Sequence, residues 1–152
     1  MVCLGNICRS PLAEGVLQHK TDMAGWNWTV DSAGTLDFHA GSAPHALSQQ
    51  VARENGVDIS QQKARPFVAA DFTRFDVIFA MDNLILAEIK KIAGSAYIEE
   101  KAKLFLNELH PGKNHDLKDP YYGPASGFQD VYQLVVQTCN AIMNNYRPST
   151  NQ

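Results

Sequence analysis

The sequence predicts an α/β fold, a doubly wound and mostly four-stranded parallel sheet with helices on both faces. Two observations predict it. Short apolar segments that suit strands alternate along the chain with segments whose apolar residues recur at helical spacing. Residues 75–81 contain a continuous apolar run, which suits a strand buried on both faces. Ligands of such sheets bind at the carboxyl ends of the strands.

The first two elements lie at the N-terminus. Val2 and Leu4 belong to the end of an apolar, strand-like run. Residues 11–20 are predicted to form a helix, with Ser10 at the N-cap and Pro11 at the first helical position. A short loop therefore connects the first strand to the first helix.

The remaining elements follow in alternation. Strands are predicted at 28–33, at 75–81 and around 103–106, and helices at 44–55 and about 83–92. The last helix is predicted by a single apolar stripe, made of Phe128, Val131, Leu134, Val135, Thr138, Ile142, Met143 and Tyr146. No repeat or linker interrupts this order.

Composition narrows the class of protein. A chain of 152 residues with 45% hydrophobic and 19% charged residues is typical of one globular domain, expected to span 1–152. The net charge of −3 argues against a nucleic-acid partner. No apolar stretch approaches about 18 residues, so no membrane partner is expected. Three cysteines without a secretory segment predict a reducing compartment, the cytoplasm.

The loop between the first strand and the first helix carries the strongest chemical signal. Five residues separate Cys3 from Arg9, and Gly5 and Asn6 in between adopt positive φ most easily. Such a loop can point backbone N–H groups inward as an anion site at the positive end of a helix dipole. Arg9 adds a planar fork of donors for oxyanions, and the thiolate of Cys3 is favoured there. The alternative is a buried thiol beside a solvated Arg.

A second signal lies in the segment Asp-Pro-Tyr-Tyr-Gly at 119–123, within a region rich in turn-forming residues. Taken alone, this segment suits a turn whose tyrosines cover apolar surface. Beside a nucleophilic Cys3, it supplies a carboxylic acid that can protonate a leaving oxygen and later activate water. The two signals together favour the chemical interpretation.

The chain resembles the low-molecular-weight protein tyrosine phosphatases, and the likeness covers essentially the whole sequence. It rests on motifs in the family's order and near its spacing: residues 2–11 followed by Ala13-Glu14, then 31–34, 63–65, 81–82 and 119–123. The first and last segments are highly specific. The others would be weak alone.

The resemblance implies hydrolysis of phosphotyrosine and aryl phosphates through a cysteinyl-phosphate. Cys3 would be the nucleophile, Arg9 would bind phosphate, and Asp119 would be the general acid and base. It implies no metal and no cofactor. The implied partners are a phosphotyrosine-containing protein and phosphate or another oxyanion in the loop.

The resemblance also implies supporting roles. Ser10 would hydrogen-bond the thiolate, Asn6 would hold the loop by bonding Ser32, and Cys8 would trap oxidised Cys3 as a disulfide. The residues expected to bind substrate are Leu4, Gly5, Asn6, Ile7, Cys8, Ser10, Phe38, Tyr121 and Tyr122.

The chain differs from family members at the start of the first strand and at Gln62, and from one relative at Ile7. Only Met1 and Val2 precede Cys3, where family members carry several more apolar residues of the first strand. Gln62 stands where many relatives have His. Ile7 gives an apolar rim where a relative acting on phosphoarginine has Thr.

Two other functions fit the same anion loop. An arsenate reductase of the same fold would need further redox cysteines near the middle of the chain, and none lies between Arg9 and Thr138. A non-catalytic phosphate-binding module would leave the combination of Cys3, Arg9 and Asp119 unexplained. The five histidines have no spacing typical of a metal site and are expected to be solvated: His19, His39, His45, His110 and His115.

Overall fold

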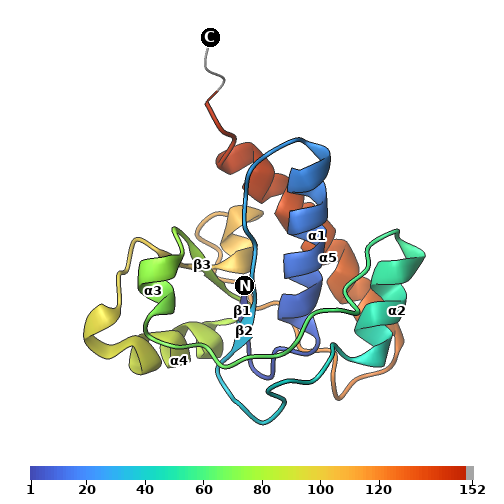
Figure 1. Ribbon diagram of the computed structural model, residues 1–152, viewed down its shortest axis with the longest axis horizontal. Helices are drawn as coiled ribbons and strands as arrows, with labels where there is room; N and C mark the ends of the chain where they lie inside the picture. The colour runs from blue at the N-terminus through green and yellow to red at the C-terminus, as the bar shows by residue number, and fades with distance from the viewer. Residues whose placement is uncertain (150–152) are drawn as a thin grey trace.

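Figure 1 shows the computed structural model of the chain, which describes residues 1–149. One four-stranded sheet has the order β2-β1-β3-β4, and every neighbouring pair is parallel. The predicted fold class is therefore confirmed. The strands are β1 (Val2–Cys3), β2 (Ala33–Gly34), β3 (Ile78–Ala80) and β4 (Ala102–Leu104).

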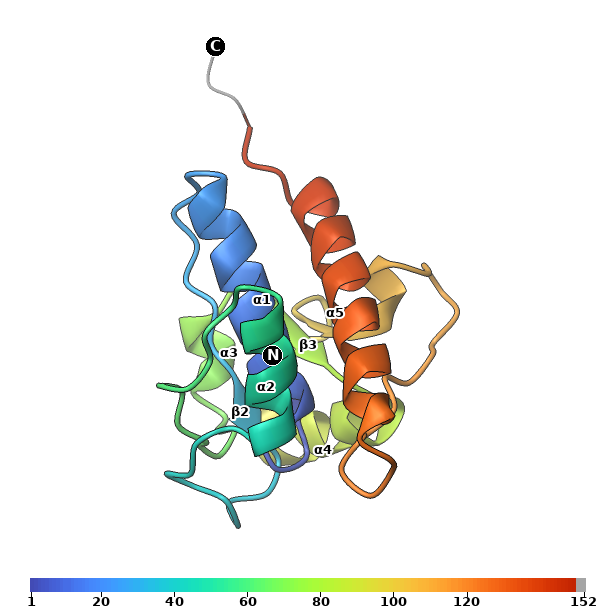
Figure 2. The ribbon, with the colours of Figure 1, turned by 90° about the vertical axis from the view of Figure 1, so that its right-hand side faces the viewer.

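Helices cover both faces of the sheet. On one face α1 packs against both α5 and α2, and Figure 2 shows α1 and α5 running side by side. On the other face α4 packs against β3 and β4. None of the helices within residues 1–149 is long and apolar enough to cross a membrane. The helices are α1 (Arg9–Met23), α2 (Ala46–Glu54), α3 (Asp71–Arg74), α4 (Asn83–Ala93) and α5 (Ser126–Asn145), with 3-10 turns at Gly94–Ala96 and Phe105–Glu108.

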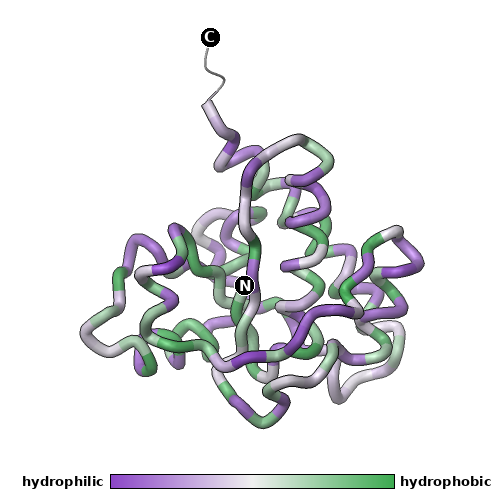
Figure 3. Tube along the Cα trace, in the orientation of Figure 1, coloured by the Kyte–Doolittle hydropathy of each residue, from purple (hydrophilic) through white to green (hydrophobic). Residues whose placement is uncertain are grey.

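The core is divided into two layers by the alternation of side chains along the strands. Cys3 and Phe79 join the apolar cluster that also contains residues of α1 and α5. Val2 and Ile78, one position earlier, join the cluster that contains residues of α4. Both faces of the central strands are thus buried, and Figure 3 shows hydrophobic segments at the centre of the molecule. This explains the continuous apolar run of the third strand.

The prediction of a strand at 28–33 is wrong for most of that range, because β2 contains only Ala33–Gly34. Its partner β1 begins at Val2, which pairs with Ala33, so no strand residue lies opposite the preceding positions. The Val30 amide donates instead to the Gln18 side chain at 2.8 Å. The length of β2 is therefore set by where its neighbour β1 offers backbone partners, and a β-like sequence does not show where those partners are.

Other boundaries differ by a few residues. The first helix begins at Arg9, with Cys8 at the N-cap and no side-chain capping bond, so the prediction of Ser10 as N-cap is wrong. The strands predicted at 75–81 and 103–106 are the shorter β3 and β4, and a 3-10 turn follows β4. The predicted helices at 44–55, 83–92 and in the C-terminal region are confirmed as α2, α4 and α5, with small shifts of their ends.

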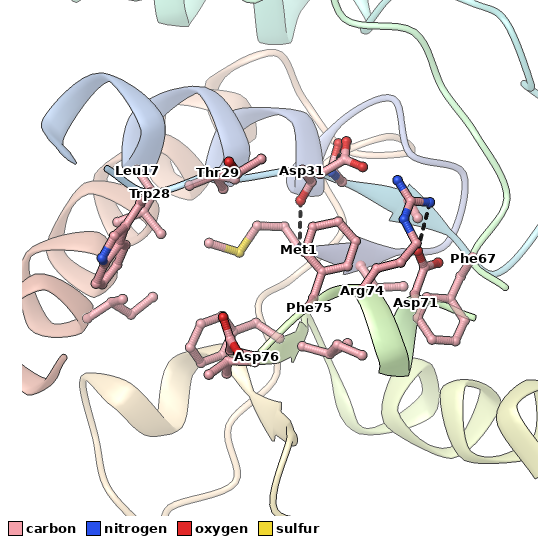
Figure 4. Close-up of a pocket in the computed structure, with 18 of the residues that line it drawn as sticks. Met1, Leu17, Trp28, Thr29, Asp31, Phe67, Asp71, Arg74, Phe75 and Asp76 are labelled. Carbon is pink, nitrogen blue, oxygen red and sulfur yellow. Dashed lines mark hydrogen bonds and ion pairs between the residues drawn. The ribbon is translucent and has the colours of Figure 1, made fainter. Parts of the chain in front are cut away.

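A cavity of about 660 Å³ lies beside Met1, at the N-terminal end of β1 (Figure 4). The Met1 ammonium donates to the Asp31 carbonyl oxygen at 2.9 Å. Burial lowers the pKa of this amine to about 6. The cavity separates the segment before β2 from the segment before β3, and its apolar lining includes Leu17, Trp28, Phe67 and Phe75.

Adding a few Val or Ile residues before Met1 is expected to raise the melting temperature by several degrees. The added side chains would be buried between the two segments, and each buried one contributes about 1.5–3 kcal/mol. A domain of this size gains about 2–4 °C per kcal/mol. The control is a Gly-Ser extension of equal length, which removes the buried ammonium but adds no apolar side chain. Equal melting temperatures for the two extensions would show that the cavity does not receive apolar residues.

Candidate functional site

Asn6 fixes the conformation of the anion loop, which we define as residues 3–10. Its φ of 56° is positive, as the sequence predicts, whereas Gly5 does not adopt a positive φ. The Asn6 amide donates to Ser10 Oγ at 2.8 Å and to Ser32 Oγ at 2.9 Å. Its Oδ1 accepts the Arg65 amide at 3.0 Å. The side chain thereby compensates the cost of the left-handed backbone.

Cys3 lies at the carboxyl end of β1, below the start of α1. It is 3% exposed, and its Sγ lies 3.0 Å from Ser10 Oγ, so the hydroxyl can donate to a thiolate. Gly34 on β2 allows the loop to pass closely, because a Cβ there would lie 2.8 Å from the Leu4 carbonyl oxygen. The nucleophile candidate thus sits at the bottom of a tightly packed loop.

Arg9 is buried and held by groups far along the chain. Its Nη1 donates to Asp82 Oδ2 at 2.6 Å and to the Leu117 carbonyl oxygen at 2.8 Å. Its Nη2 lies 3.6 Å from Asp119 Oδ2. Asp82 follows β3 and also caps α4 by accepting the Ile85 amide at 2.8 Å. The guanidinium is therefore oriented before any ligand arrives.

The acid loop, defined here as residues 119–123, lies next to the anion loop although it is more than 100 residues further along the chain. The amide of Leu117 donates to the Met81 carbonyl oxygen at 2.8 Å, which anchors the approach to this loop beside the end of β3. Asp119 is half-buried, and its Oδ1 accepts the Tyr121 amide at 3.1 Å. Tyr121 and Tyr122 are exposed, with their rings edge to face at 4.7 Å.

A cavity of about 220 Å³ joins the two loops. It brings together Cys3, Arg9 and Asp119 with most of the predicted substrate contacts. The side chains of Asn6, Ser10 and Ser32 are buried and do not line this cavity. The lining residues are Cys3, Leu4, Gly5, Ile7, Cys8, Arg9, Leu36, Phe38, His39, Asp119, Tyr121 and Tyr122.

A charged network supports the loop from behind. Arg65 lies 3.0 Å from Asp31 Oδ2 through Nη2 and 3.0 Å from Asp71 Oδ2 through Nη1. Burial and a hydrogen bond with Asp31 raise the pKa of Glu14 to about 7. Because the Arg65 backbone amide also binds Asn6, this network and the anion loop form one connected structure.

Cys8 and Gln62, two positions singled out from the sequence, are both affected by burial. Burial, together with the charges of Asp119 and Cys3, raises the pKa of Cys8 to about 12, so Cys8 is a neutral thiol at neutral pH. Gln62 donates to the Pro11 carbonyl oxygen at 3.1 Å, which attaches it to α1 behind the loop. Among the described residues, its buried Oε1 has no hydrogen-bond partner.

Sequence reasoning missed several contributors. Asp82 sits at the predicted end of a strand adjacent to β1, and this position was the signal that could have found it as the partner of Arg9. Leu36 and His39 also line the cavity. The expectation that all histidines are solvated is wrong for His45, which is half-buried between aromatic rings. Within residues 1–149, no group of three or more His, Cys, Asp or Glu side chains is placed to hold a metal ion.

Comparison with known proteins extends the similarity beyond these loops. The family described as low molecular weight phosphotyrosine protein phosphatase matches residues 1–150. A protein of that name from Schizosaccharomyces pombe is 41% identical over 138 residues, which cover 88% of this chain and 87% of the relative.

Solved structures agree. Vibrio vulnificus Wzb in complex with benzylphosphonate has a TM-score of 0.84 and 31% identity, covering 95% of this chain and 94% of that one. Drosophila arginine phosphatase has a TM-score of 0.87 and 31% identity, covering 97% of this chain and 96% of that one. The similarity therefore includes the sheet and helices that hold the two loops.

Proposed function

Because the chain belongs to the low molecular weight phosphotyrosine protein phosphatase family, we propose that it hydrolyses phosphotyrosine in the cavity between the anion loop and the acid loop. In this proposal Cys3 is the nucleophile, Arg9 binds the phosphoryl group, and Asp119 is the general acid and base. The observation that carries the proposal is one small cavity lined by all three side chains. No metal and no organic cofactor takes part.

In the first step the Cys3 thiolate attacks phosphorus opposite the tyrosyl oxygen. A sulfur–phosphorus bond forms as the bond from phosphorus to the tyrosyl oxygen breaks, and Asp119 gives its proton to that oxygen. Loop amides and the Arg9 guanidinium bind the three other phosphoryl oxygens, where charge is concentrated. The hydrogen bond and ion pair that orient Arg9 support this role, since little reorganisation is then needed.

In the second step water cleaves the cysteinyl-phosphate. The Asp119 carboxylate takes a proton from the water as its oxygen attacks phosphorus, and the bond from sulfur to phosphorus breaks. The Ser10 hydroxyl, 3.0 Å from Cys3 Sγ, stabilises the departing thiolate by donating to it. Inorganic phosphate then leaves, and Asp119 is again protonated for the next substrate.

The exposed aromatic residues define the proposed substrate class, a phosphotyrosine within a protein. Phe38 is 85% exposed and Tyr122 is 92% exposed, and both line the cavity mouth. In this proposal they flank the phenyl ring of the substrate, and the remaining contacts come from other lining residues, namely Leu4, Gly5, Ile7, Cys8 and Tyr121. The side chains of Asn6 and Ser10, which were expected to bind substrate, are buried and do not line the cavity. The net charge of −3 supports neither nucleic acid nor an anionic membrane as a partner.

Turnover of phosphotyrosine is expected to exceed that of phosphoserine and phosphoarginine strongly. The thiolate lies at the bottom of the cavity, where a long, flat phenyl ester reaches it more easily than a short alkyl ester. Ile7 adds an apolar surface beside the ring. The measurement is kcat/KM for matched peptides that carry each phosphorylated residue. Comparable values for all three peptides would contradict the proposed substrate class, without affecting the assignment of Cys3.

The arsenate reductase alternative gains no support from the cysteines. Cys3 and Cys8 line the cavity, whereas Cys139 is fully buried in the cluster that contains residues of α1 and α5. All three thiols are free. The proposed compartment is the cytoplasm, because an odd number of cysteines, three, is typical of functional rather than structural thiols in a reducing environment.

Oxidation by peroxide is expected to inactivate the enzyme reversibly through a disulfide between Cys3 and Cys8. Hydrogen peroxide converts the Cys3 thiolate to a sulfenic acid, and Cys8 sulfur then attacks that sulfur and releases water. Because the pKa of Cys8 is raised to about 12, its thiolate fraction and the closing rate should rise with pH above neutrality. Cys8→Ser should recover less of its own initial activity in dithiothreitol than the native chain does. Equal recovery of both would contradict the trapping role.

A further inference from the structure

We infer that His45 is a positioning residue, which holds the acid loop against the anion loop. The inference rests on the proposed function of Asp119, because the acid loop matters for catalysis through that carboxylate. Nothing in the spacing of the histidines indicates this role. Three sets of contacts to His45 carry it, to the anion loop, to α2 and to two aromatic rings.

The first contact is to the anion loop. His45 precedes α2, and its backbone amide donates to the Ile7 carbonyl oxygen at 2.8 Å. Three residues further, Ser48 Oγ donates to the Cys8 carbonyl oxygen at 3.3 Å. The start of α2 is thus attached to two consecutive carbonyl groups of the anion loop, and His45 moves with that loop.

The second contact fixes the direction of the imidazole. His45 Nδ1 accepts the Leu47 amide at 3.1 Å, which makes the side chain the N-cap of α2. A ring held in this way donates from Nε2 only and has one preferred orientation. As the cap, His45 stabilises α2. This stabilising role can be separated by substitution from any effect that the imidazole has on the acid loop.

The third contact is aromatic. One face of the imidazole stacks on Phe128, with centroids 4.9 Å apart and an interplanar angle of 28°. Tyr121 meets the same imidazole nearly at right angles, with centroids 5.8 Å apart and an interplanar angle of 79°. Phe128 is 3% exposed and belongs to α5, so it is a fixed support. His45 therefore connects a rigid helix to the otherwise exposed Tyr121.

Tyr121 in turn contacts Asp119, the proposed acid. Its backbone amide donates to Asp119 Oδ1 at 3.1 Å, while Asp119 Oδ2 lies 3.6 Å from Arg9 Nη2. Without the imidazole, the tyrosine ring would lose its contact with the α2 start, and the loop would sample positions in which the carboxyl group is misdirected. Proton transfer requires hydrogen-bond distance, so a displacement of about 1 Å is costly.

Two variants separate the cap from the ring. His45→Asn keeps a side-chain acceptor for the Leu47 amide and removes the aromatic contacts. His45→Phe keeps a ring between Phe128 and Tyr121 and removes the acceptor. For each variant we would measure the melting temperature, hydrogen exchange of the amides of 119–123, and the single-turnover rate against the pKa of the leaving group.

We expect opposite patterns. His45→Asn should keep the native melting temperature within about 2 °C, but exchange faster at 119–123, react about tenfold more slowly with phosphotyrosine and depend more steeply on the leaving group. His45→Phe should melt about 2–4 °C lower, because the cap is lost, yet keep the native leaving-group dependence. In a Tyr121→Ala background, His45→Asn should add little further loss of rate.

The outcomes are distinguishable. Native exchange and native leaving-group dependence in His45→Asn would overturn the inference, and so would equal steepening in both variants, which would assign the effect to the cap. Asp119→Ala is measured in parallel. If Asp119→Ala has the native leaving-group dependence while His45→Asn still exchanges faster at 119–123, the positioning role stands and the acid assignment fails.

Discussion

Cys3→Ser is expected to lose at least about 10⁴-fold of the turnover of aryl phosphates. A serine hydroxyl at this position would have to lose its proton before it could attack, and the group 3.0 Å away is the Ser10 hydroxyl, which can stabilise an anion but does not remove a proton. In the first step Asp119 is protonated in the proposed mechanism and cannot take that proton. The thiolate is both nucleophile and leaving group in the proposed mechanism. Both chemical steps therefore fail together, and no phosphoenzyme should accumulate after mixing with substrate.

Phosphate binding should survive the same substitution, because Arg9 and the loop amides remain. We would measure the dissociation constant of inorganic phosphate by calorimetry alongside turnover. Cys139→Ala is the matched control: it removes a fully buried thiol away from the cavity and should retain turnover even if it lowers stability. Substantial turnover by Cys3→Ser would leave the loop as an anion site that takes no covalent part in the reaction.

Asp119→Ala is expected to slow phosphotyrosine hydrolysis by about 10²–10⁴-fold, which is about 3–5.5 kcal/mol of barrier. The tyrosyl oxygen leaves poorly without a proton, because the pKa of a free phenol of this kind is about 10. A nitrophenyl phosphate has a better leaving group and should lose less. The carboxyl group that the variant lacks is the one that lies 3.6 Å from Arg9 Nη2.

Single-turnover rates against the pKa of the leaving group measure the first step alone. Asp119→Ala should give a much steeper dependence than the native chain. Asp116→Ala is the control, because this exposed carboxylate precedes the acid loop and binds the Asn83 amide rather than Arg9. Parallel lines for native chain and Asp119→Ala would transfer the search for the acid to Asp82 and Asp37.

Local features of this protein could be predicted from its amino-acid sequence alone. The alternation of apolar patterns predicted four parallel strands and the helices around them, because burial on one or two faces imposes a period on contiguous residues. The anion loop was equally local. Asn6 adopts the positive φ expected of its residue type, and Cys3 and Arg9 are brought together by a loop of only five intervening residues. The role of Asp119 came from the family resemblance, since nothing in a turn-rich segment links it to Cys3.

Contacts between distant segments could not be predicted in this way, because they depend on how the elements pack. Residues 28–32 have a β-like sequence but no strand partner, because β1 begins at Val2. Arg9 is held by Asp82 and Leu117, and His45 lies between Phe128 and Tyr121. These positions lie far apart in the chain and meet where the sheet order and the packing of α2 and α5 place them. Periodicity indicates which face of an element is buried, but not which other element covers it, so the partners of these side chains could be found only in the folded molecule.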